Sequence, residues 1–302
     1  MFKRIFLFLA LNFAIVLTIS LLLSVFQVKP YLNAYGIDYT QLAIFCLIWG
    51  MAGAFISLLL SRKMAKWSMG VKLLSGHEAN PLLQSVYDIT IRLAQRAHLP
   101  EMPEVGVFQG SEPNAFATGP SKRRSLVAVS TGLLEKMDKT ELEAVIGHEI
   151  SHIVNGDMVT MTLLQGVINA FVMFLARALA LAFSGFGRDR DGKSAGSYLS
   201  YTLFTFLFEI IFMTLGSLIV AYFSRYREYR ADSGSADMLG KQPMIRALQK
   251  LEASTKHTSK AESVPESVAA FLIHRPKKRS WITLFATHPP IEDRIAKLNE
   301  RF

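Results

Sequence analysis

Residues 139–157 read KTELEAVIGHEISHIVNGD, and this stretch carries two histidines, His148 and His152, four positions apart. Residues four apart on an α-helix lie on one face, about one turn from each other. Both imidazoles can therefore bind a single metal ion. Glu149 follows the first histidine and lies about 100° further around the helix, where it can reach a water molecule on that ion and act as a general base.

This spacing is the one that zinc metalloproteases use. A pattern with three fixed positions also occurs by chance, so the motif alone leaves open whether the site is catalytic. A catalytic zinc usually has three protein ligands and an open position for water. The chain contains one cysteine, Cys46, which excludes an intrachain disulfide and a zinc site built from thiolates. A third ligand must therefore be another histidine or a carboxylate.

The best candidate for the third ligand is Glu228, in the helix-compatible segment 224–232. Asp232 follows Glu228 by about one turn and can accept a hydrogen bond from the far nitrogen of a ligand histidine. The alternative for this segment is a charged helix that faces solvent beside a membrane. Spacing alone favours that alternative.

The composition indicates a membrane protein. The chain has 302 residues, of which 51% are hydrophobic and 19% are charged, whereas soluble domains carry about 25% charged residues. The apolar residues gather in four blocks, each close to or above the roughly 20 residues that span a bilayer. These blocks are residues 5–26, 40–61, 158–184 and 199–223. The first could instead be a cleaved signal peptide, but it is long for one and lacks a small-residue cleavage site, which favours a membrane helix.

The net charge of +9 comes largely from Lys and Arg beside the apolar blocks. This placement favours a negatively charged membrane surface over nucleic acid as the partner, and no nucleic-acid-binding motif is recognisable. By the positive-inside rule, the N-terminus and the segment after residue 61 face the cytoplasm. His148 precedes the third block and Glu228 follows the fourth, so two crossings return the chain to the same side.

Two charged residues lie inside the apolar blocks, Arg177 in the third and Glu209 in the fourth. Counted from the linker between the two blocks, they lie at similar depth. Inserting a lone charge at mid-bilayer costs roughly 2.5–3.5 kcal/mol of free energy. We expect them to pair across the hairpin. The alternatives are that Arg177 reaches toward the linker, or that the hairpin lines a cavity.

The remaining sequence predicts a mainly α fold with a small β-sheet. The predicted helices cover 82–97, 131–137, 139–154 and 225–254, and the predicted strands cover 104–109 and 125–130. Thr140 is a candidate cap for the helix that carries the histidines. The overall prediction is a polytopic membrane protein with about four transmembrane helices and a cytoplasmic, zincin-like metalloprotease domain.

This prediction divides the chain into four parts. Residues 1–61 form two transmembrane helices, 62–157 the first part of the protease domain, 158–223 a transmembrane hairpin, and 224–302 the second part of the protease domain.

Four segments, in order, resemble the HtpX family of bacterial membrane heat-shock proteases, zinc enzymes of the HExxH gluzincin type. They read PNAFATGPSKRRSLVAVSTGLL, ELEAVIGHEISHIVNGD, FSRYREYRADSGSADML and THPPIEDRI. The resemblance covers nearly the whole chain. It implies one Zn²⁺ per chain, held by His148, His152 and Glu228, in a protease of the cytoplasmic (inner) membrane that acts on misfolded or damaged membrane proteins.

The resemblance also implies roles for residues outside the motif. Asn114, Ala115, Phe116 and Ala117 would belong to an edge strand that aligns an extended substrate by main-chain pairing, although an ordinary surface turn is the alternative. His288 would lie near the zinc and steady the oxyanion or block the metal at rest; the alternative is a polar residue that merely precedes a helix.

The expected mechanism is metal-assisted peptide hydrolysis, in which Glu149 takes a proton from water and passes it to the leaving amine. The alternatives are a prenyl-protein-type membrane protease, which has more membrane spans, and a non-catalytic zinc-binding membrane scaffold. The expected partners are protein substrates, chiefly membrane proteins, and the lipid bilayer. The sequence sets neither a cleavage preference nor an oligomeric state.

Overall fold

The structure is a computed structural model that describes residues 38–184, 195–258 and 284–301. The first apolar block, 5–26, lies outside the described residues. The chain forms two compact units, which are described one at a time. We call Met1–Ile56 with Thr162–Val220 the helical unit, and Ser57–Met161 with Ala221–Phe302 the sheet unit.

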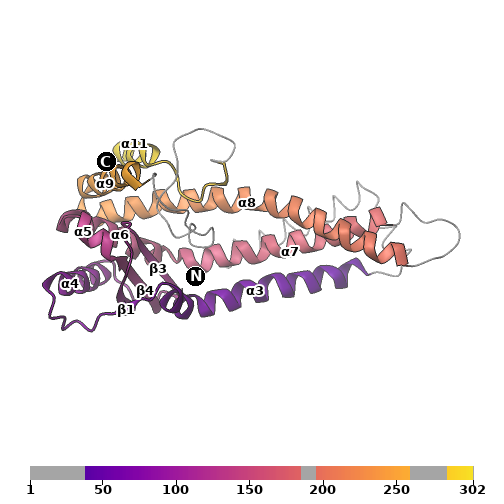
Figure 1. The fold of residues 1–302 in the computed structure, drawn as a ribbon, viewed down its shortest axis with the longest axis horizontal. Coiled ribbons are helices and arrows are strands. Elements are labelled where there is room, and N and C mark those ends of the chain that lie inside the picture. Colours follow the sequence, from indigo (N-terminus) through magenta and orange to yellow (C-terminus); the bar gives the residue numbers. More distant parts are fainter. Residues whose placement is uncertain (1–37, 185–194, 259–283, 302) are drawn as a thin grey trace. The chain divides into compact units, whose positions relative to one another are not determined.

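The helical unit is built from parts of three long helices, α3 (Tyr39–Ser68), α7 (Asp157–Ser184) and α8 (Ala195–Leu239) (Figure 1). Within the described part of the chain, these are the three helices long and apolar enough to cross a membrane. They correspond to the second, third and fourth predicted blocks. Three of the about four predicted membrane helices are therefore present among the described residues, and the fourth stays a prediction.

Close packing between α3 and α7 depends on small residues. A Cβ atom added at Gly50 would lie 2.5 Å from the backbone nitrogen of Ala170, so only glycine fits this approach. Gly53, by contrast, has nothing within 4 Å of such an atom. Small residues let helix backbones approach closely, which is a common means of association in membranes.

The predicted pair between Arg177 and Glu209 is present. An Nη1 atom of Arg177 donates to Oε1 of Glu209 at 3.0 Å, and the same nitrogen donates to the carbonyl of Met173. The pair therefore joins α7 to α8 inside their apolar segments. Both side chains are only partly buried, with 25% and 33% of their surfaces exposed.

Reversing either charge of this pair is expected to lower the yield of folded protein, because two like charges would then face each other in an apolar setting. The yield of monodisperse, detergent-purified protein measures the effect for Arg177→Glu and Glu209→Arg. The double variant restores opposite charges and should recover much of the parent yield. A double variant as poor as the singles would contradict the pairing.

The sheet unit contains a four-stranded sheet in the order β1-β2-β4-β3. Its strands are β1 (Lys72–Leu73), β2 (Glu104–Phe108), β3 (Ala115–Ser121) and β4 (Arg124–Ser130). β2 and β4 run parallel, and the other two pairs are antiparallel. The two predicted strands are both present as β2 and β4. β3 lies at the edge of the sheet.

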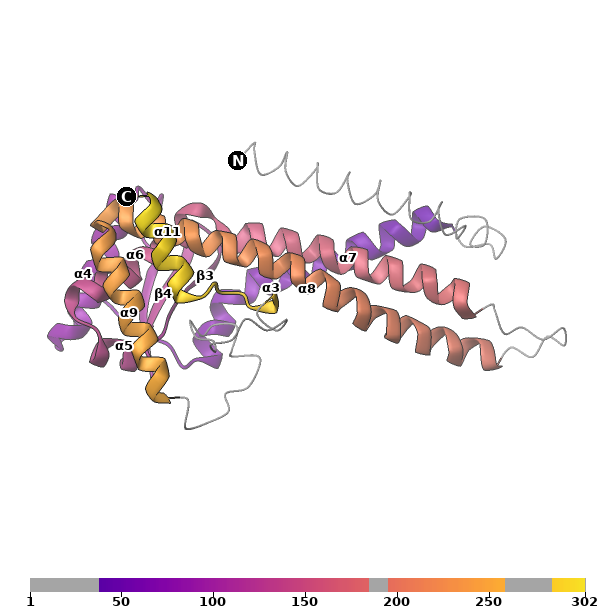
Figure 2. The ribbon, with the colours of Figure 1, turned by 90° about the horizontal axis from the view of Figure 1, so that it is seen from above.

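Among the described residues, the sheet unit also contains parts of α3, α7 and α8 and five complete helices (Figures 1 and 2). They are α4 (Pro81–Arg96), α5 (Thr131–Lys136), α6 (Lys139–Asn155), α9 (Lys241–Thr258) and α11 (Ile291–Arg301). Their apolar faces and the inner residues of the sheet form one core, which includes Leu93, Val127, Ile146, Ile150 and Leu248. The predicted helix 225–254 is in fact two helices, because Gly240 adopts φ 85° between α8 and α9.

The prediction that Thr140 caps α6 is wrong. Asp138 is the cap: its carboxylate accepts from the backbone nitrogen of Glu141 at 2.8 Å. The Glu141 carboxylate in turn accepts from the backbone nitrogen of Asp138 at 3.0 Å. This reciprocal capping box satisfies two backbone donors at the start of α6.

Candidate metal centre

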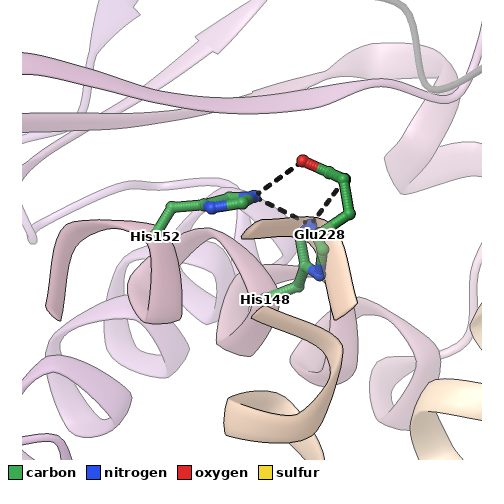
Figure 3. Close-up of side chains that lie close together, drawn as sticks. All are labelled: His148, His152 and Glu228. Atoms are coloured by element: carbon green, nitrogen blue, oxygen red, sulfur yellow. Dashed lines mark hydrogen bonds and ion pairs between the residues drawn. The ribbon is translucent and has the colours of Figure 1, made fainter. Parts of the chain in front are cut away.

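α6 places the two histidines of the motif on one buried face. The Nε2 atoms of His148 and His152 lie 3.1 Å apart, and the side chains are buried (Figure 3). The helix is held at both ends, by the capping box and by Gly156, which adopts φ 65° and closes the last turn. Glycine takes this left-handed conformation without the steric cost that a Cβ atom imposes.

Glu228 reaches the same point from α8. Its Oε2 lies 3.5 Å from Nε2 of His148, and its Oε1 lies 3.3 Å from Nε2 of His152. Among the described residues, these three form the group of His, Cys, Asp or Glu side chains that could hold a metal ion, with one ligand atom from each within 4.8 Å of the others. The structure thus brings together the three residues that the sequence analysis expects to bind the metal.

Glycine and serine residues let α8 approach α6 closely enough for Glu228 to reach the two histidines. A Cβ atom added at Gly234 would lie 2.5 Å from Oγ of Ser151, and one added at Gly147 would lie 2.9 Å from Oγ of Ser235. The Ser235 hydroxyl donates to the carbonyl of Ala144 at 2.7 Å, which ties the two helices together. Larger residues at the glycines would push Glu228 away from the histidines.

Two carboxylates orient the histidine rings. Oδ1 of Asp232 lies 2.9 Å from Nδ1 of His148, as the spacing predicted, and Oδ2 of Asp157 lies 2.7 Å from Nδ1 of His152. Such partners hold the proton on Nδ1 and leave the Nε2 lone pair for a metal. The sequence offered no role for Asp157 beyond ending α6. Its contact arises because Gly156 turns the chain back toward His152.

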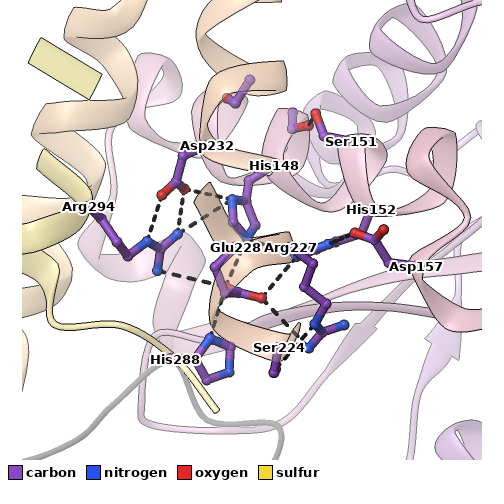
Figure 4. A network of polar contacts seen from close by, with 12 residues as sticks. His148, Ser151, His152, Asp157, Ser224, Arg227, Glu228, Asp232, His288 and Arg294 are labelled. Carbon is purple, nitrogen blue, oxygen red and sulfur yellow. Dashed lines mark hydrogen bonds and ion pairs between the residues drawn. The ribbon is translucent and has the colours of Figure 1, made fainter. Parts of the chain in front are cut away.

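Arg294 is a residue of the centre that the sequence did not reveal. It is buried, and it donates from Nε to Oδ2 of Asp232 at 2.7 Å and from Nη2 to Oδ1 at 2.5 Å (Figure 4). A signal was available: Arg294 falls between Ile291 and Leu298 on the apolar face of α11. A charge in an apolar stripe needs a buried partner.

The other predicted site residues surround one cavity with the three ligands. Its lining includes Glu149, His288 and the strand residues Ala115, Phe116 and Ala117. His288 lies with Nδ1 2.9 Å from Oε2 of Glu228. The edge strand β3 therefore borders the same cavity as the three candidate metal ligands.

Asn114 differs from its neighbours. It lies just before β3 rather than in it, it is buried, and it is not among the residues that line the cavity. Its backbone pairs with Ser130, whose hydroxyl accepts from the Asn114 nitrogen at 2.9 Å. Asn114 thus fixes the start of the edge strand.

The carboxylates dominate the electrostatics of the metal-free centre. Burial alone would lower the pKa of His148, but Asp232 and Glu228 outweigh burial and raise the pKa to about 9. At His152 too, burial alone would lower the pKa, but the carboxylates of Glu228 and Asp157 outweigh burial and raise it. For Arg294, burial is outweighed by Asp232, which raises the pKa and keeps the guanidinium charged.

The donor atoms fit a divalent metal. With Nδ1 of each histidine donating to a carboxylate, the two Nε2 atoms face each other 3.1 Å apart as acceptors. Oε1 of Glu228 is buried and has no hydrogen-bond partner among the described residues. When both rings are neutral, two nitrogen lone pairs and a carboxylate oxygen converge in a buried place and repel one another, and either a proton or a metal ion between them relieves this repulsion.

Comparison with known proteins identifies the family. Residues 82–302 match the family model of peptidase family M48. The chain belongs to peptidase family M48. It is 47% identical to the "Protease HtpX homolog" of Polaromonas naphthalenivorans over 98% of both chains, and 45% identical to that of Bacillus licheniformis over 99% of both. The resemblance to HtpX proteases is thereby confirmed, and the M48 chain is a membrane metalloprotease.

The fold also resembles that of a solved structure. The crystal structure of S. mikatae Ste24p superposes with a TM-score of 0.58 at 18% sequence identity. The match covers 97% of this chain and 66% of that one, so this M48 chain spans about two thirds of the length of Ste24p.

In this M48 centre, Asp232→Asn is expected to weaken metal binding about 10- to 100-fold, because the ring of His148 loses its charged acceptor and Arg294 loses its counter-ion. Competition with a chromophoric chelator measures the change in dissociation constant. Asp237→Asn is the matched control, since Asp237 lies on the same helix and its charged partner among the described residues is the exposed Arg301. Equal affinities for the two variants would contradict the role of Asp232.

Metal affinity is expected to fall as the pH falls from about 9. The raised pKa of His148 means that the metal-free protein holds a proton there below that pH, and the metal must displace it. One displaced proton lowers the affinity about tenfold per pH unit, and the slope steepens once His152 is also protonated. Chelator competition at several pH values tests this; a constant affinity between pH 7 and 9 would contradict it.

Proposed function

We propose that this M48 protein is a zinc-dependent endopeptidase of the cytoplasmic (inner) membrane that hydrolyses peptide bonds of misfolded or damaged membrane proteins. The observation that carries the proposal is that Glu149, the three metal ligands and an edge strand border one cavity. Two histidines and a glutamate are a ligand set of catalytic zinc sites, in which a further position stays open for water. Zinc is accordingly the metal proposed.

The reaction is proposed to depend on three groups of this chain. When bound, zinc would supply a Lewis acid that polarises the scissile carbonyl and makes water acidic near neutral pH. Glu149 takes the proton from the attacking water and delivers it to the leaving amine. Ala115–Ala117 pair with the main chain of an extended substrate, and His288 donates a hydrogen bond to the oxyanion.

Charge distribution supports an active site on the cytoplasmic side. Arg62, Lys63 and Lys66 lie at the cytoplasmic end proposed for α3, in the turns that follow its apolar segment. The proposed layout keeps the two parts of the protease domain, 62–157 and 224–302, on either side of the hairpin 158–223. Because a hairpin crosses the membrane twice, both parts lie on one side.

Restoring zinc to metal-depleted protein tests this function. The purified, metal-free protein should not cleave casein, and stoichiometric Zn²⁺ should restore cleavage, whereas Mg²⁺ should not. A protein that binds zinc tightly but never cleaves would favour the scaffold alternative. Cleavage restricted to prenylated peptides would favour the prenyl-protein protease alternative.

A further inference from the structure

The segment that carries His288 is held to α8 at two points. We call residues 284–290 the strap. It is largely irregular, with a short 3₁₀ turn at its start, and it leads directly into α11. A side chain on an irregular segment is less well fixed than one on a helix, so a precise position for His288 requires contacts from outside the strap.

The first point is a contact made by Arg225. Its Nη1 atom donates to the carbonyl of Leu284 and to the carbonyl of Ala286, at 2.9 Å each. A guanidinium can bind two acceptors in a fixed plane, which an ammonium group does less well. Arg225 therefore fixes the strap just before His288.

The second point is the buried pair between Arg294 and Asp232, which fixes the first turns of α11 just after the strap. The anchoring residues Arg225, Glu228 and Asp232 follow one another at i, i+3 and i+7, so they share one face of α8. Glu228 lies between the two anchors and contacts His288. One helix face thus presents an anchor, a metal ligand and a second anchor in succession (Figure 4 shows the last two).

We propose that Arg225 and Arg294 are positioning residues that hold the strap across the metal centre and so keep His288 at the cavity. The catalytic consequence rests on the proposed function, since it takes His288 as the oxyanion donor. Of these two arginines, Arg225 gives the clearer test. Its described contacts go to strap carbonyls, whereas Arg294 is also linked to the metal site through Asp232 and His148. Loss of Arg225 should therefore displace His288 without loss of metal.

The position of the strap can be measured without any activity assay. Ala286 is 7% exposed, so a thiol placed there by Ala286→Cys should react slowly with a maleimide while the strap is held. The experiment uses the full-length, zinc-loaded protein with Cys46→Ala, which removes the native thiol. Arg225→Ala should accelerate labelling at least tenfold, and Arg225→Lys should have a smaller effect. Arg246→Ala, which removes an exposed arginine of α9, is the control and should change nothing.

Activity measurements then test whether the strap positions His288 for catalysis. His288→Ala should lower kcat about 10²- to 10³-fold, the range for removal of one oxyanion donor. Arg225→Ala should approach the same loss with zinc content at the parent level, and the double variant should be no slower than His288→Ala alone. A merely structural role for Arg225 would instead give losses that multiply.

Four results would overturn the proposal. The first two are rapid labelling of Ala286→Cys while Arg225 is intact, and labelling that Arg225→Ala leaves unchanged. The other two are losses that multiply in the double variant, and loss of zinc from Arg225→Ala. Failure of the proposed function is distinguishable, because an inactive parent protein leaves the labelling rates fully interpretable.

Discussion

Glu149→Gln is expected to lower kcat for protein hydrolysis about 10²- to 10⁴-fold, the contribution of a positioned general base, while metal content stays at the parent level. The amide keeps the size of the side chain but cannot accept a proton from water at neutral pH. Glu149 is not one of the three residues whose ligand atoms converge, so the metal should remain. Casein cleavage and zinc content, measured on the same preparation, give both halves of the result.

Glu143→Gln is the matched control for this experiment. Glu143 lies on the same helix and pairs at the surface with Arg92, so the control should cleave at the parent rate. Self-cleavage gives a second readout, since purified parent protein should degrade when zinc is added and Glu149→Gln should stay intact. Cleavage by Glu149→Gln at the parent rate would rule out Glu149 as the base.

Glu228→Ala is expected to weaken metal binding by more than about 100-fold and to abolish proteolysis. Loss of a residue that only orients a ligand already lowers metal affinity about 10- to 100-fold, and loss of the ligand itself should lower it further. Two histidines would remain as ligands, with no carboxylate bound directly to the ion. Asp237→Ala, on the exposed side of the same helix, should behave like the parent.

Metal content after purification and affinity by chelator competition measure this effect. Unchanged affinity in Glu228→Ala would mean that another side chain completes the centre. His288 would be the first to examine, because its Nδ1 already lies 2.9 Å from the Glu228 carboxylate.

The parts of the centre that the sequence predicted depend on local periodicity. His148 and His152 share a helix face because they are four apart, and Asp232 lies on the face of Glu228 for the same reason. The Arg177–Glu209 pair followed from the cost of charge in an apolar block. These inferences used the period of one helix or the cost of charge in a bilayer. Glu228 as the third ligand came instead from the resemblance to HtpX proteases, because spacing alone favoured a helix that faces solvent.

The parts that the sequence did not predict depend on contacts between distant elements. Arg294 meets Asp232 across 62 positions of sequence, and no periodicity links α11 to α8. Asp157 reaches His152 only because Gly156 adopts a left-handed turn. The cap at Asp138 was missed because Thr140 is a good cap by composition, whereas the reciprocal contact with Glu141 decided the position.

The order of the ligands along the chain has a consequence for biosynthesis. His148 and His152 are translated before the hairpin, and Glu228 after it, while Arg294 comes close to the C-terminus. A ribosome-bound chain therefore lacks a complete centre until both apolar segments between them have been made. The centre therefore cannot cut a neighbouring protein, or its own chain, before both of these segments have been synthesised.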